Sequence, residues 1–221
     1  MKVNIFVEGV DDQELVAALL SKLGKVVAWE ITGKARQGST VAGAQVFIYQ
    51  ADGWTNLPAK NIKPFLQQDE AVGVRNLIVF DADHPSDPHG GFTGRKAELH
   101  RQATELGLFF DLFLLPVNSA DGNLEDLLKD LIHPDHQQVV SCFSNYENCL
   151  RGCVSPDGLP YRIPASKAKI YAYVEAMPLT DEERREHKRR GATKYFGNSA
   201  YWNLDAAQVQ PLRAFLDQHI Q

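Results

Sequence analysis

A run of apolar residues with no polar break lies near the middle of the chain and ends in two acids. Residues 76–83 read NLIVFDAD, so four apolar residues from Leu77 to Phe80 stand directly before Asp81 and Asp83. A strand with one face in water alternates apolar and polar residues, whereas a strand covered on both faces is apolar throughout. The run therefore predicts a strand that is covered on both faces, as in the parallel sheets of α/β proteins.

Strand-like and helix-like segments alternate through the first 132 residues. Short runs rich in β-branched and aromatic residues predict further strands within 2–7, 25–31, 44–54 and 108–116. Apolar residues at helical spacing, or good helix formers after a cap, predict helices at 11–23, 61–72, 96–107 and 123–132. Small residues at 33–44 and glycines and prolines at 84–95 predict loops. This alternation predicts an α/β fold with a mostly parallel sheet flanked by helices.

The strand signal fades after about residue 133. Helices are expected at 136–151, 166–176, 179–191 and 205–220. A length of 221 residues suits one domain. We therefore expect a single domain over 1–221, with a core at about 1–132 and a helical C-terminal elaboration at about 133–221.

Composition narrows the functional classes. The net charge of −5 argues against a protein that coats nucleic acid without specificity, although it leaves room for a local basic surface. No stretch of 18 apolar residues is present, which predicts no membrane span and no membrane partner. The three cysteines lack the spacing of a zinc site and fit a reducing cytoplasm.

Acids gather where the predicted strands end. The first strand stops at Glu8, and the helix after it opens with Asp11 and Asp12. Asp81 and Asp83 follow the buried strand, and Glu125 opens the helix after the strand at 108–116. Parallel strands present their carboxyl ends, and the loops that follow them, at one edge of the sheet, where α/β proteins bind ligands. We therefore expect these acids to converge.

Clustered carboxylates repel one another unless they are protonated or bind a cation. Ligand sets made only of oxygen suit Mg²⁺ or Mn²⁺, and two such ions can clamp a phosphoryl group during transfer. The alternative is structural, because Asp11 and Asp12 could cap a helix, and Glu125 and Asp126 could interact with a helix dipole.

At these residues the sequence resembles the Toprim superfamily, which occurs in topoisomerases, primases and OLD-family nucleases. Glu8-Gly9 through Asp12 matches the first Toprim motif, and Asp81-Ala82-Asp83 matches its D-x-D motif. The whole chain also resembles a small stand-alone bacterial Toprim-like family of unknown function. Ser86 stands where topoisomerase-type members have glycine, and no nucleophile or ATPase domain accompanies the motifs, so topoisomerase activity is not expected.

The resemblance implies a ligand set and a helper residue. By analogy with OLD-like nucleases, the metal ligands would be Glu8, Asp12, Asp81, Asp83 and Glu125. Glu8 would also act as a general acid or base. A lysine that assists catalysis is expected later in the chain, with Lys169 as the candidate and Lys167 as its alternative.

A basic cluster lies near the C-terminus. Arg189, Arg190 and Lys194 are its candidate contacts to a nucleic-acid backbone, with Tyr195 and Phe196 nearby for base stacking. The alternative is a solvated helix, because acidic residues are interleaved with the basic ones from residue 181 to 186.

The combined features predict a Mg²⁺- or Mn²⁺-dependent phosphoryl-transfer enzyme that acts on DNA or RNA, of the kind found in OLD-like Toprim nucleases. A Toprim module that binds nucleic acid or a partner protein without cleaving is the alternative. A receiver-like domain is a third reading, which the D-x-D pair and Glu8 argue against. The oligomeric state is left open.

Overall fold

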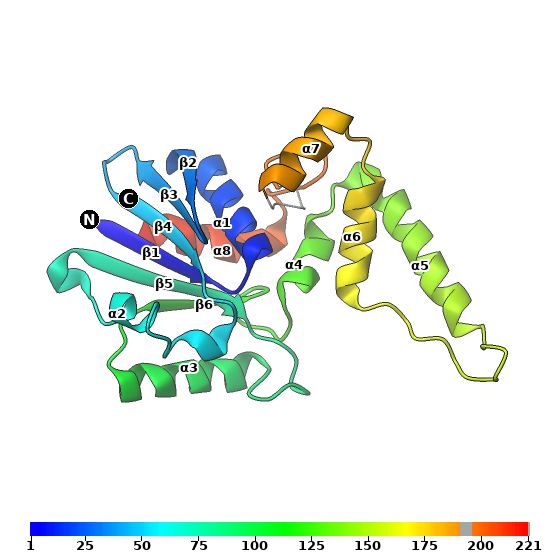
Figure 1. The fold of residues 1–221 in the computed structure, drawn as a ribbon, viewed down its shortest axis with the longest axis horizontal. Coiled ribbons are helices and arrows are strands. Elements are labelled where there is room, and N and C mark those ends of the chain that lie inside the picture. The colour runs from blue at the N-terminus through cyan, green and yellow to red at the C-terminus, as the bar shows by residue number, and fades with distance from the viewer. Residues whose placement is uncertain (191–195, 221) are drawn as a thin grey trace.

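The computed structural model describes residues 1–190 and 196–220, with only the backbone described at 186–190. Its centre is one six-stranded sheet in the order β2-β3-β4-β1-β5-β6 (Figure 1). The strands are β1 (Lys2–Val7), β2 (Val26–Thr32), β3 (Ala35–Thr40), β4 (Gln45–Gln50), β5 (Val74–Asp81) and β6 (Asp111–Leu115). β4, β1, β5 and β6 pair in parallel, and β3 pairs antiparallel with both its neighbours. The predicted mostly parallel sheet is confirmed.

Helices cover both faces of the sheet. They are α1 (Val10–Lys22), α2 (Lys63–Leu66), α3 (Phe92–Leu106), α4 (Leu124–Leu131), α5 (Gln137–Arg151), α6 (Ser166–Ala176), α7 (Asp181–Arg190) and α8 (Gln210–His219), with short 3₁₀ turns at Trp54–Asn56, Glu70–Val72, Pro134–His136 and Ala207–Val209. Leu77 and Val79 of β5 pack in one apolar cluster with α1, α4 and α8, whereas Ile78 and Phe80 pack in a second cluster with α2 and α3. The unbroken apolar run is thus explained by burial on both faces.

Three expectations for local structure were wrong. Residues 33–44, expected to be a loop, contain β3. The small residues of β3 let β2 approach closely, since a Cβ at Gly38 would lie 2.4 Å from Val26 Cγ1. The helix expected at 61–72 is reduced to the four residues of α2 and a separate 3₁₀ turn that Asp69 caps. The loop expected to reach residue 95 ends earlier, because the backbone N–H of Phe92 donates to Asp121 Oδ1 at 2.7 Å and begins α3 there.

The regular elements after residue 132 in the described part of the chain are all helices, joined by irregular segments. α5 and α6 form a hairpin that extends away from the sheet (Figure 1), and we call residues 137–176 the arm. α8 returns to the sheet and buries Leu212 and Leu216 in the first apolar cluster. Within the described ranges, none of the helices has the length and apolar character needed to cross a membrane.

Candidate functional site

Four acids lie at the carboxyl edge of the parallel strands. Glu8 follows β1, and Asp81 ends β5, the neighbour of β1 in the sheet. Glu8 Oε1 accepts a hydrogen bond of 3.1 Å from the backbone N–H of Asp81. Asp12 lies in the first turn of α1, and Asp83 lies two residues beyond β5. We call these four side chains the acid group.

Backbone amides hold three of the four carboxylates in place. In addition to the bond to Glu8, the N–H of Gly9 donates to Asp12 Oδ2 at 3.0 Å, and the N–H of Leu124 donates to Asp81 Oδ1 at 2.8 Å. Asp12 is only 7% exposed, and its second oxygen, Oδ1, is buried with no hydrogen-bond partner among the described residues. A buried acceptor in this state is costly unless a proton or a cation reaches it.

Burial and mutual repulsion change the acidity of the group. Burial is the main cause that raises the pKa of Glu8 to about 7, with a contribution from Asp83. Burial likewise raises the pKa of Asp12 to about 7, and the nearby Glu8 adds to the effect. The pKa of Asp81 lies well above its usual value because of burial and the charges of the other three acids. Near neutral pH the group therefore holds protons that a cation could displace.

Asp83 has a partner that the sequence did not reveal. Its backbone is left-handed, with φ of 58°, and its side chain forms an ion pair with Arg95 of α3. Arg95 is 1% exposed, and its guanidinium lies 4.1 Å from the ring centre of Trp54. Arg95 was missed because it fell inside a predicted loop, where no periodicity indicates which way a side chain points.

The two acids in the first turn of α4, Glu125 and Asp126, have different environments. Asp126 caps α4, since its Oδ2 accepts from the N–H of Asn123 at 3.1 Å, and its Oδ1 lies 2.7 Å from Lys129 Nζ. The structural alternative is therefore correct for Asp126. Glu125 is half-buried in the same turn, and within the described chain its carboxylate makes no hydrogen bond or ion pair. Its role as a metal ligand stays a prediction.

The donor set fits a hard cation, but it is not assembled. All four side chains offer oxygen, and Asp12 Oδ1 is buried and unpartnered. However, no three His, Cys, Asp or Glu side chains in the described ranges are already grouped around a metal position. Amides hold one oxygen of each of three acids, and Arg95 holds Asp83. Arg95 holds one oxygen of Asp83, so an ion that binds Asp83 through that oxygen would have to displace Arg95.

The lysine expected to assist catalysis has other partners. Lys169 lies in α6, where its Nζ is 3.0 Å from Glu147 and 3.3 Å from Ser144 Oγ of α5. These contacts join the two helices of the arm. Its catalytic role stays a prediction. For the nucleic-acid contacts, the side chains of Arg189 and Arg190 and the whole of Lys194 lie outside the described residues.

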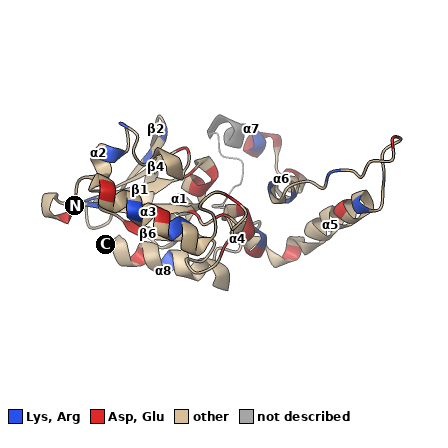
Figure 2. Ribbon diagram, turned by 90° about the horizontal axis from the view of Figure 1, so that it is seen from below, with Lys and Arg blue, Asp and Glu red and all other residues tan. Residues whose placement is uncertain are grey.

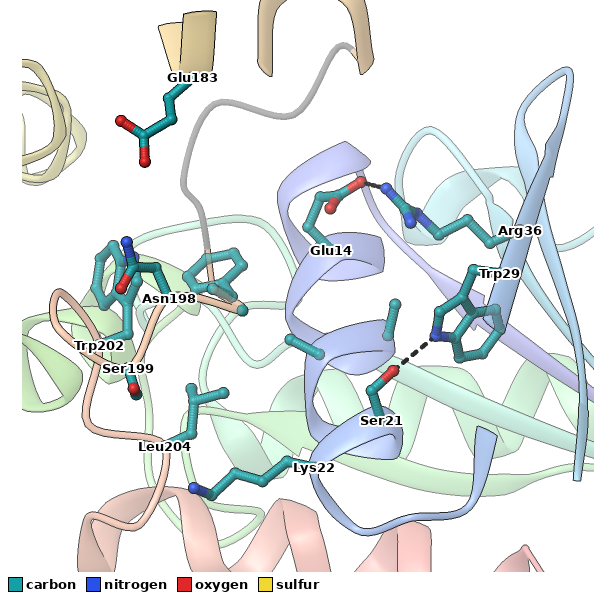
Figure 3. Close-up of a pocket in the computed structure, with 14 residues that line it drawn as sticks. Glu14, Ser21, Lys22, Trp29, Arg36, Glu183, Asn198, Ser199, Trp202 and Leu204 are labelled. Carbon is teal, nitrogen blue, oxygen red and sulfur yellow. Dashed lines mark hydrogen bonds and ion pairs between the residues drawn. The ribbon is translucent and has the colours of Figure 1, made fainter. Parts of the chain in front are cut away.

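A separate cavity of about 710 Å³ lies beside α1, between β2–β3 and residues 196–204 (Figure 3). Polar side chains that line the cavity interact with one another: Glu14 forms an ion pair with Arg36, and Trp29 Nε1 donates a hydrogen bond of 3.0 Å to Ser21 Oγ. No member of the acid group lines it. The cavity therefore does not mark the candidate site.

Comparison with known proteins gives a family but no activity. A family model described as "Protein of unknown function (DUF3226)" matches residues 2–221. A search of curated proteins found no match. The matched range includes the acid group and the arm, so the function must be inferred from the geometry of the site.

Proposed function

The chain belongs to the DUF3226 family over almost its full length, and on the geometry of its acid group we propose that it is a Mg²⁺- or Mn²⁺-dependent phosphoryl-transfer enzyme. We further propose that it cleaves nucleic acid, in the manner of an OLD-like Toprim nuclease. The observation that carries the proposal is the buried, unpartnered Asp12 Oδ1 beside Glu8 and Asp81, two acids with raised pKa values. A divalent cation would satisfy this oxygen and relieve the repulsion.

Each acid has a defined part in the proposal. Asp12 and Asp81 would hold a cation, since the amides of Gly9 and Leu124 fix their carboxylates and leave one oxygen of each for the ion. Glu8 would hold or exchange a proton with the attacking water, since its pKa of about 7 suits proton transfer near neutral pH. A bound cation would polarise the phosphoryl oxygen and acidify its own water. Asp83 and Glu125 would complete the ligand set.

The arm favours nucleic acid as the substrate. Residues 137–176 carry four lysines and arginines against three acids, a net +1 in a chain whose total is −5. Figure 2 shows these basic positions at the outer end of α5, along the connection and on α6. Tyr146, Tyr161 and Tyr171 are 50%, 45% and 39% exposed on the same arm. Exposed aromatics beside basic residues suit base stacking and phosphate contact.

We also place the activity in the cytoplasm. Cys142, Cys149 and Cys153 are free and exposed in the structure. Exposed free thiols persist in a reducing compartment. Whether DNA or RNA is the natural substrate would follow from the assay below.

The test is cleavage of labelled single-stranded and duplex DNA and RNA in Mn²⁺, in Mg²⁺ and in EDTA. Cutting should need the metal and should stop in Glu8→Gln, because an amide can neither bind a cation as an anion nor exchange the proton. Glu30→Gln is the matched control, since Glu30 is exposed on β2 and away from the acid group. Equal cutting by Glu8→Gln and wild type would reveal a contaminating nuclease and refute the proposal.

A specific observation supports a second function. Asp83 forms an ion pair with Arg95, and the described residues contain no three side chains already arranged to bind a metal ion. These features favour a module that binds nucleic acid or a partner protein without cleaving it. Wild-type protein that binds an oligonucleotide equally in EDTA and Mn²⁺, with no product after long incubation, would favour this second function.

A further inference from the structure

Arg95 is a buried charge with only part of its hydrogen-bonding capacity used. Its Nη2 pairs with Asp83, whereas Nε and Nη1 are buried and have no partner among the described residues. One face of the guanidinium lies against Trp54, which orients it. Buried arginines usually have partners for their donors, so two buried nitrogens without a partner, beside an acid site, point to a ligand that accepts hydrogen bonds.

We propose that Arg95 binds a phosphate group of the substrate, with Trp54 as its platform, and that Asp83 blocks this contact until a cation binds. The inference rests on the proposed function and names the anionic subsite of the same site. Planar guanidinium groups hold phosphate through two parallel N–H bonds, which lysine cannot provide. The free donors of Arg95 thus match the group that a phosphoryl-transfer enzyme must hold.

The position of the Asp83 contact explains the block. A guanidinium offers two edges for a two-point contact, one from Nε and Nη2 and the other from Nη1 and Nη2. Nη2 carries two hydrogens, one on each edge, and Asp83 accepts one of them. Asp83 therefore closes one edge, and its negative charge repels a phosphate that approaches the other edge. Release of Asp83 to a cation would free the closed edge and remove this repulsion.

The same exchange couples the two ligands. A cation that draws Asp83 away from Arg95 would create the phosphate contact, and a phosphate that takes Arg95 would release Asp83 to the cation. Each ligand must then strengthen the other by the same factor. The acid group, which lacks an assembled metal position in the described residues, would therefore bind a cation more tightly when phosphate is also present.

Phosphate would reach Arg95 by way of the loop after β5. Residues 84–89 are exposed, and left-handed residues flank the loop, with φ of 58° at Asp83 and 80° at Gly91. Several of its hydrogen bonds are internal, such as Asp87 N–H to His84 O at 2.9 Å and Gly90 N–H to Asp87 O at 2.8 Å. His89 lies with its ring 5.8 Å from that of Trp54. A shift of this loop as a unit would keep these internal bonds and would break the contact of His84 Nε2 with Asp126 Oδ2, which are 3.4 Å apart.

The test is calorimetric titration with inorganic phosphate, with and without saturating Mg²⁺. For wild type, Mg²⁺ should strengthen phosphate binding by about 5- to 100-fold, the usual range of coupling between two sites. Arg95→Lys keeps the charge but loses the two parallel N–H donors. It should weaken phosphate binding at least about tenfold while the Mg²⁺-induced rise in melting temperature remains. Arg101→Lys is the matched control, because Arg101 lies on the same helix and pairs with Glu98 and Glu105 at the surface.

A second variant tests Arg95 without any metal. Asp83→Asn weakens the hold on Nη2, so phosphate should bind more tightly than to wild type even in EDTA, and should raise the melting temperature of the variant. Phosphate affinity that is the same in wild type, Arg95→Lys and Asp83→Asn would overturn the inference and make Arg95 a structural residue. If wild type shows no Mg²⁺ response but Asp83→Asn binds phosphate, the metal proposal fails and the assignment of Arg95 stands.

Discussion

Asp12→Asn should make the metal-free protein more stable, and the gain should depend on pH. The amide oxygen can still accept the hydrogen bond from Gly9 that Asp12 Oδ2 accepts now. The amide nitrogen can donate to the neighbouring carboxylates, one of which, Glu8, raises the pKa of Asp12. The substitution therefore removes a buried charge and keeps the helix cap.

The magnitude follows from the raised pKa. The pKa of Asp12 rises from the usual 3.8 to about 7 in the native state. At about 1.4 kcal/mol for each pH unit, this corresponds to an upper bound of about 4 kcal/mol of native-state destabilisation above pH 7. Because Glu8 and Asp81 share the repulsion, we expect about 1–2 kcal/mol, or about 2–8 °C in melting temperature for a chain of this size.

The direction of the pH dependence can be stated in advance. A native pKa above the unfolded pKa means that the native state keeps its proton while the unfolded state loses it. The wild type therefore loses stability from about pH 4 to about pH 7, after which the loss stays constant. The gain of Asp12→Asn should be near zero at pH 4 and largest at pH 8.

Thermal and urea unfolding in EDTA at pH 4, 6 and 8 would measure the difference. Asp130→Asn is the control, because Asp130 is exposed on α4. A constant loss of stability at every pH for Asp12→Asn would refute the reasoning. It would show that Asp12 acts as a helix cap that needs its charge.

Two further predictions distinguish neighbouring residues. Asp81→Asn should leave metal-free stability at pH 8 unchanged or raised. Asp83→Asn should lower it because Arg95 loses its charged partner, but by less than the ~3–5 kcal/mol of a fully buried pair, since Asp83 is 30% exposed. Urea unfolding that ranks the two variants the other way would contradict this. Arg162→Glu on the arm should weaken oligonucleotide binding. It should also reduce the slope of log binding constant against log salt concentration by about 0.7–1.4, which corresponds to one or two phosphate contacts. Lys63→Glu on α2, at the opposite end of the molecule (Figure 1), is the control, and equal anisotropy curves for the two variants would exclude the arm as a binding surface.

The sequence was sufficient for five of the six strands and for most of the helices. The apolar run at 77–80 predicted burial on both faces, and alternate residues of that run do enter two separate clusters. The placement of acids after β1 and β5 followed from a rule of topology, because parallel neighbours present their carboxyl ends together. Both inferences used local sequence patterns, which can be recognised without knowledge of long-range contacts.

The parts that the sequence did not reveal depend on distant partners. β3 is a strand because β2 and β4 pair with its backbone, although Gly38 and Ser39 have low strand propensity. α3 begins at Phe92 because Asp121, 29 residues later, accepts its N–H. The Arg95–Asp83 pair depends on that early start of the helix, so no spacing in the sequence could have indicated it.

Titration of the protein with Mn²⁺ at pH 8, followed by the electron paramagnetic resonance signal of free Mn²⁺, tests the central claim most directly. If the acid group binds divalent cations, wild type should remove at least one Mn²⁺ per chain from the free signal. Asp12→Asn should remove none, and binding should weaken as the pH falls below about 7, where Glu8 and Asp12 take up protons. An undiminished Mn²⁺ signal with wild type, or equal binding by Asp12→Asn, would contradict the account.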